Sequence, residues 1–126
     1  MLRGIDFIWD QAEEMGLADK LIVVVGSEFG RTPGYNGGNG KDHWSVNSMM
    51  AMGVGIPGNT VIGGSDEGHR PLTVNPSTLA LDPNGVRIRP EHVHAALRKI
   101  AGLENDALSS RFPLDIQDPM DLFGNG

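Results

Sequence analysis

The run Leu21-Ile22-Val23-Val24-Val25 is apolar at every position, and its last four residues are all β-branched. A strand without polar alternation is typical of a parallel sheet that is covered by helices on both faces. An amphipathic segment precedes this run directly, and a helix followed by such a strand is half of an α/β repeat. The sequence therefore predicts a buried parallel strand over residues 21–25.

The segment before this strand has the periodicity of a helix over residues 2–15. Its apolar residues recur at intervals of three and four, and they are Leu2, Ile5, Ile8, Trp9, Ala12 and Met15. Gly16 stands where the glycine that ends a helix is expected. A second helix is predicted over 90–101, because Pro90 suits a first helical turn and Gly102 suits a helix end.

Shorter apolar runs at 48–54, 60–63 and 86–88 are further strand candidates. Together with the two helices they predict an α/β fold with a mostly parallel sheet in a single domain, residues 1–126. The tail over residues 110–126 contains Pro113 and Pro119 and is expected to be irregular.

The composition excludes several classes of protein. The 126 residues carry 10 Lys+Arg and 16 Asp+Glu, a formal charge of −6, which argues against a nucleic-acid binder. No cysteine is present, so disulfides and thiolate ligands are excluded. No apolar stretch approaches the ~20 residues of a membrane span, so no membrane partner is expected. Gly and Pro number 18 and 8, which indicates many turns and long loops.

A candidate site follows the apolar strand, at the end where open α/β sheets place their ligands. Glu28 offers carboxylate oxygens, and Arg31 offers a planar fork for a small anionic substrate. A glycine-rich loop over 26–43 leads to Asp42 and His43. If this loop folds back, the carboxylates of Glu28 and Asp42 and the imidazole of His43 could hold a divalent metal such as Zn, Mn, Mg or Ca.

Each of these residues also has a plain structural interpretation. Glu28 could be a solvated loop carboxylate, Arg31 a surface ion-pair partner, and His43 a packed histidine beside Trp44. His69 lies in a polar turn and is expected to be exposed. His92 and His94 are two apart on a helix, so they point in different directions and are not expected to chelate one ion.

These residues also carry a family resemblance. Two segments on either side of a glycine-rich spacer resemble the C-terminal part of the DUF1501 proteins, which are placed in the alkaline phosphatase-like, sulfatase-like superfamily. The segments are Ser27-Glu28-Phe29-Gly30-Arg31-Thr32 and Gly40-Lys41-Asp42-His43-Trp44. Weaker matches follow at Gly55-Ile56-Pro57-Gly58, Val61-Ile62-Gly63, Asp66-Glu67 and the helix that ends before Gly102-Leu103.

The resemblance implies an α/β/α sandwich with a metal site at the strand ends, and a chain that is a C-terminal fragment of such a protein. His43 resembles a metal-binding histidine of the superfamily, and Glu28-Phe29 resembles the position of an Asp-His pair. Phe29 cannot ligate a metal, and no residue of the chain matches the nucleophile. Relatives also suggest bacterial export to the periplasm.

Two functions remain open on this basis. The first is the metal-binding part of a hydrolase for phosphate or sulfate esters, inactive as this fragment, with Glu28, Asp42 and His43 on the metal and Arg31 on the substrate. The second is a non-catalytic binding or assembly domain with a degenerate metal site, which Phe29 favours. In either case the apolar strand needs cover beyond what the chain supplies, so we expect the chain to form a homo-oligomer or to pair with the missing half of the protein.

Overall fold

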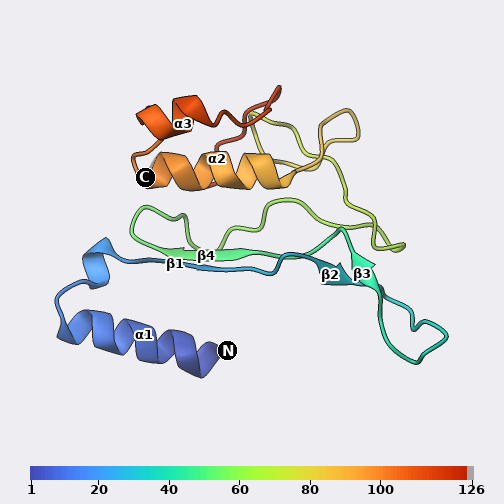
Figure 1. Cartoon of the computed structure of the whole chain (residues 1–126), viewed down its shortest axis with the longest axis horizontal. Helices are drawn as coiled ribbons and strands as arrows, with labels where there is room; N and C mark the ends of the chain where they lie inside the picture. The colour runs from blue at the N-terminus through green and yellow to red at the C-terminus, as the bar shows by residue number, and fades with distance from the viewer. Residues whose placement is uncertain (125–126) are drawn as a thin grey trace.

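The computed structural model describes residues 1–124 (Figure 1). The helices lie before and after the strands in this part of the chain, and its four strands fall between residues 22 and 53. The elements, in chain order, are α1 (Leu2–Glu14), the 3-10 helix η1 (Ala18–Lys20), β1 (Ile22–Val25), β2 (Gly30–Arg31), β3 (His43–Trp44), β4 (Met50–Gly53), α2 (Pro90–Ile100) and α3 (Ala107–Arg111).

The four strands form one interrupted antiparallel ribbon. β1 pairs with β4, Ile22 lying opposite Gly53, and β2 pairs with β3, Arg31 lying opposite His43. Between the two ladders, residues 26–29 face residues 45–49, so the returning strand carries one residue more. The ribbon thus runs out along β1 and β2, turns over residues 32–42, and returns along β3 and β4.

This arrangement corrects the predicted fold class. The described residues hold two small antiparallel sheets of two strands each, and not a mostly parallel α/β/α sandwich. A parallel neighbour requires a crossover connection, usually a helix. The segment between β1 and β4 contains no helix, and it folds back on itself as a hairpin. Consequently the apolar strand meets its partner in the antiparallel direction.

The two predicted helices are confirmed, and both end as expected. Gly16 and Gly102 have φ of 64° and 68°, the left-handed conformation that suits glycine. The residue after each glycine donates its backbone N–H to a carbonyl of the last helical turn. These hydrogen bonds join Leu17 N to Ala12 O and Leu103 N to Arg98 O, each at 2.8 Å. These are Schellman caps, which satisfy carbonyls that would otherwise lack partners.

Figure 1 shows α1 and α2 on opposite sides of the β1–β4 ladder. α1 buries Ile5 and Ala12, and α2 buries Ala96 and His92. None of the helices within residues 1–124 has the length and apolar character that crossing a membrane requires.

The segment between β4 and α2 consists of turns around Val74, the most deeply buried residue of the described chain. Val74 exchanges both backbone hydrogen bonds with Val86, each at 2.9 Å. These contacts are isolated bridges, so the strand predictions at 60–63 and 86–88 are wrong. The short runs there lack an adjacent strand with which to form a ladder.

The tail packs on α2. Met120 is buried, and Lys99 Nζ lies 2.7 Å from Asp121 Oδ2. The first residues of the predicted irregular tail belong to α3, and those from Phe112 to Gly124 are irregular as expected. Residues 125 and 126 lie outside the described part of the chain.

Candidate functional site

The β2–β3 hairpin brings the two ends of the glycine-rich loop together, the condition on which the candidate site depends. Phe29 and Arg31 are two residues apart, and His43 lies opposite Arg31, so the three side chains share one face of the ladder. The rings of Phe29 and His43 stack with centroids 3.7 Å apart and planes 21° from parallel. The Arg31 guanidinium lies 5.2 Å from the centroid of the Phe29 ring.

Asn36 holds the tip of this hairpin. Its side-chain oxygen accepts hydrogen bonds from the amides of Gly38 and Gly40, both at 3.0 Å. Its side-chain nitrogen donates to Asp42 Oδ1 at 2.7 Å. Thr32 closes the base, because its amide donates to the carbonyl of Asp42 and its hydroxyl accepts from the Asp42 amide. The loop therefore has a defined shape although glycines dominate it.

We expect Asn36→Ala to loosen this loop without unfolding the rest of the chain. Three hydrogen bonds are lost, each worth about 0.5–1.5 kcal/mol net, less what water recovers at exposed groups. Amide hydrogen exchange at Gly38 and Gly40 should accelerate about tenfold. The control is Asn105→Ala, because Asn105 makes one long contact, 3.4 Å, to its neighbour Glu104. Unchanged exchange at both glycines in Asn36→Ala would show that Asn36 does not order the loop.

The four predicted site residues divide between the two faces of the hairpin. Arg31 and His43 share the face of the stack. Asp42 and His43 are consecutive residues in extended chain, and successive side chains of a strand point to opposite faces. The carboxylate of Asp42 is bound by Asn36, and Arg31 Nη1 donates to the carbonyl of Lys41 at 3.1 Å. Glu28 is exposed.

The divalent-metal site expected at Glu28, Asp42 and His43 stays a prediction. No group of three or more His, Cys, Asp or Glu side chains placed to hold a metal ion occurs in the part of the chain that the structure describes. The site supplies instead an exposed planar stack of a phenyl ring, an imidazole and a guanidinium. Behind it, on the other face, Trp44 Nε1 donates to the carbonyl of His69 at 3.0 Å.

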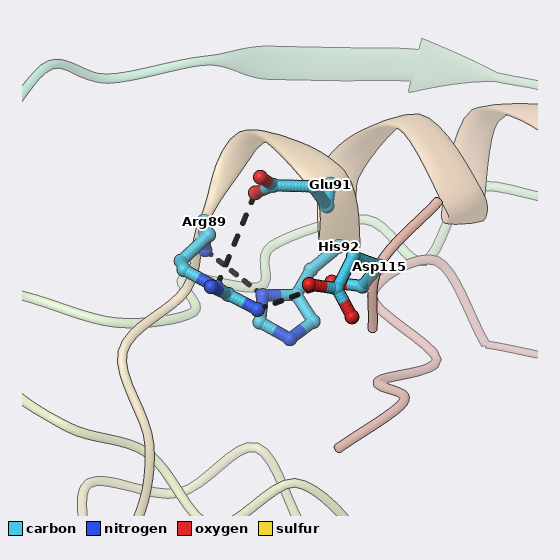
Figure 2. A network of polar contacts seen from close by, with 4 residues as sticks. All are labelled: Arg89, Glu91, His92 and Asp115. Carbon is cyan, nitrogen blue, oxygen red and sulfur yellow. Dashed lines mark hydrogen bonds and ion pairs between the residues drawn. The ribbon is translucent and has the colours of Figure 1, made fainter. Parts of the chain in front are cut away.

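A second polar site surrounds His92, which the sequence reasoning dismissed. His92 is 3 % exposed and is the third residue of α2. Its Nδ1 accepts the backbone N–H of Arg89 at 2.9 Å, which caps the helix (Figure 2). The signal was present in the sequence, since Pro90 marks the first helical turn and a side-chain acceptor at the third position completes a cap.

Arg89 links this helix start to the tail of the chain. Its Nη2 donates to the backbone carbonyl of Asp115 at 3.2 Å, and its Nε lies 4.0 Å from Glu91 Oε2. Figure 2 shows these contacts around the His92 ring. A cavity of about 250 Å³ adjoins the ring. It is lined by Val86, Arg87, Arg89, His92, Asp115, Gln117 and Asp118.

Comparison with known proteins identifies the class of the chain. The model of the family described as "Protein of unknown function (DUF1501)" matches residues 3–109, which include both the hairpin and α2. The chain therefore belongs to the DUF1501 family, which confirms the resemblance at that level. Among curated proteins and among solved structures, none matches the chain. The relationship to alkaline phosphatases and sulfatases stays a prediction.

Proposed function

We propose that the chain is a non-catalytic assembly domain that binds a second copy of itself. The observation that carries this proposal is its surface area. The chain exposes 9278 Å², whereas a compact monomer of 13.5 kDa exposes about 6,500 Å². The excess is roughly 2,800 Å². Obligate dimers bury roughly 2,000–5,000 Å² in total, about half from each chain, so the excess exceeds what a stable dimer needs.

The proposed interface lies along β1 and the adjoining side of α1. In the described chain β1 pairs on one edge, with β4, so its other edge presents unpaired backbone groups. Val24 in this strand is 38 % exposed. Ile8 on α1 and Met15, which directly follows the helix in helical conformation, are exposed and seven residues apart, about two helical turns, so they lie on the same side. Leu17 is also exposed just beyond the helix end.

A second copy suits this surface better than an unrelated partner. The unpaired backbone N–H and C=O groups on the free edge of β1 can form hydrogen bonds with the same edge of a second copy. Two antiparallel copies of Ile22–Val25 would form a four-stranded sheet with β4 at each outer edge, related by a twofold axis. The strand carries no charge, so the net charge of −6 does not act at the contact itself. Each copy would bring the same apolar residues of α1 to the interface.

The hydrolase alternative has less support from the geometry. Phe29 stands where a ligand would be needed and packs on His43, while Asp42 and Arg31 are engaged in holding the hairpin. These contacts favour a structural role for the motif. Export to the periplasm, which the resemblance implies, stays a prediction.

Sedimentation equilibrium over a micromolar range tests the proposal. We expect a dimer, and we expect Val24→Lys to raise its dissociation constant at least tenfold, because the ammonium group loses water at the interface. Val61→Lys is the matched control, since Val61 is 92 % exposed and lies outside the strands and helices. It should leave the dissociation constant unchanged.

Two results would contradict self-association through β1. One is a folded monomer at 100 µM. The other is a dimer that Val24→Lys and Val61→Lys weaken equally, since the contact would then lie elsewhere.

A further inference from the structure

We propose that the cavity beside His92 binds a small zwitterion, a compound that carries one carboxylate and one ammonium group, of which an α-amino acid is the simplest kind. This site is separate from the proposed dimer surface, since it is formed by the start of α2 and the tail of the chain.

The His92 ring supplies a donor without a partner. Because Nδ1 accepts the Arg89 N–H, the tautomer assigned from this bond places the proton of the neutral ring on Nε2. Within residues 1–124, Nε2 makes no hydrogen bond, although the residue is 97 % buried and lines the cavity. Figure 2 shows this nitrogen on the side of the ring away from the Arg89 backbone. Nε2 is not among the fully buried polar atoms of the described chain, so it is open to the cavity and can donate to an acceptor that enters it.

The charges of the lining define the ligand. Arg87 and Arg89 are cationic, Asp115 and Asp118 are anionic, and their formal charges cancel. A simple anion would meet two carboxylates, and a simple cation would meet two guanidinium groups. A zwitterion can place its carboxylate by His92 Nε2–H and Arg87, and its ammonium by Asp115 and Asp118, so that each end meets an opposite partner.

The size and walls of the cavity limit the rest of the ligand. Its volume of about 250 Å³ is slightly below the range of about 300–1,000 Å³ for drug-sized ligands. Val86 is its one aliphatic wall. A compound with a short apolar side chain fits these limits, so L-alanine is a suitable probe.

The test is an NMR titration that follows the Nε2 and ring-proton signals of His92 in the full chain. We expect L-alanine to shift them saturably in the millimolar range. Propionate lacks the ammonium group and ethylamine lacks the carboxylate, and each should bind at least tenfold more weakly. Binding of propionate as tight as that of alanine would overturn the zwitterion assignment. Unshifted His92 signals at 50 mM alanine would overturn the site.

Two variants separate binding from folding. Arg87 is exposed and makes no hydrogen bond within the described chain, so Arg87→Ala should fold normally and weaken binding at least tenfold. His92→Asn keeps a side-chain oxygen that can accept the Arg89 N–H, but it removes Nε2. It should retain the helix signal and lose binding. His94→Asn alters an exposed histidine of the same helix and should bind like wild type. Equal affinity in wild type and Arg87→Ala would contradict the proposed orientation.

Discussion

Gly53→Ala should lower the free energy of unfolding by more than about 3 kcal/mol, one of the two largest effects expected in this chain. Gly53 lies opposite Ile22, at the end of the β1–β4 ladder farthest from the turn, and has φ of 128°. A Cβ there would overlap the carbonyl oxygen of Leu21 and lie 2.9 Å from Ile22 Cα. Both atoms are backbone, so the two strands would have to separate.

The matched control is Gly55→Ala. Gly55 also has positive φ, 73°, but a Cβ at this position meets nothing within 4 Å. The Gly55→Ala variant should lose only about 1–2 kcal/mol of unfolding free energy, the cost of placing alanine in the left-handed conformation. Urea unfolding of both variants at one protein concentration measures the difference, because self-association would make stability depend on concentration. If both variants lose the same unfolding free energy, the contact between a Cβ on residue 53 and the backbone of β1 does not destabilise the fold.

The helices could be predicted from the sequence because their signals are local. The apolar period of α1 and α2 and the glycines that end them act within a few residues. The strand at 22–25 was equally clear. Whether this strand pairs in the parallel or the antiparallel direction could not be predicted. Apolar residues on both faces of a strand indicate only that the strand is covered, and helices can cover a strand in either kind of sheet. The connection between β1 and β4 determines the direction, and its many glycines and lack of helical period are compatible with a hairpin and not with a crossover helix.

The candidate site was predictable in part. The sequence offered the folding back of the loop over 26–43 as a condition of the site, and the register of β2 and β3 places Arg31 opposite His43. The alternation of side chains along a strand would have placed Asp42 on the other face, but this rule applies only once residues 42–44 are known to be extended. The capping contact of His92 has a local signal in Pro90, but the cavity beside the ring could not be predicted, because it depends on the tail around residues 115–118, which is distant in sequence.

Gly30→Ala is expected to open the β2–β3 hairpin and to cost about 3 kcal/mol. Gly30 lies opposite Trp44, and a Cβ on Gly30 would overlap the carbonyl oxygen of Val46. This oxygen is a backbone atom, so the chain around Val46 would have to move away from β2. His43 would then move off Phe29, and the ring-current shifts of the His43 protons should disappear in NMR spectra. Loss of these shifts together with lower stability would tie the aromatic stack to the closed hairpin.

Gly34→Ala controls for the loss of a glycine in the same hairpin, since a Cβ there meets nothing within 4 Å. Its effect should be within about 1 kcal/mol of zero, because alanine also restricts the unfolded chain. Intact His43 shifts in Gly30→Ala would show that Val46 yields without opening the ladder. The β1–β4 ladder lies beyond the interruption at 26–29, so a dimer formed through β1 should persist in Gly30→Ala. Its loss there would mean that the hairpin, and not the edge of β1, forms the contact between copies.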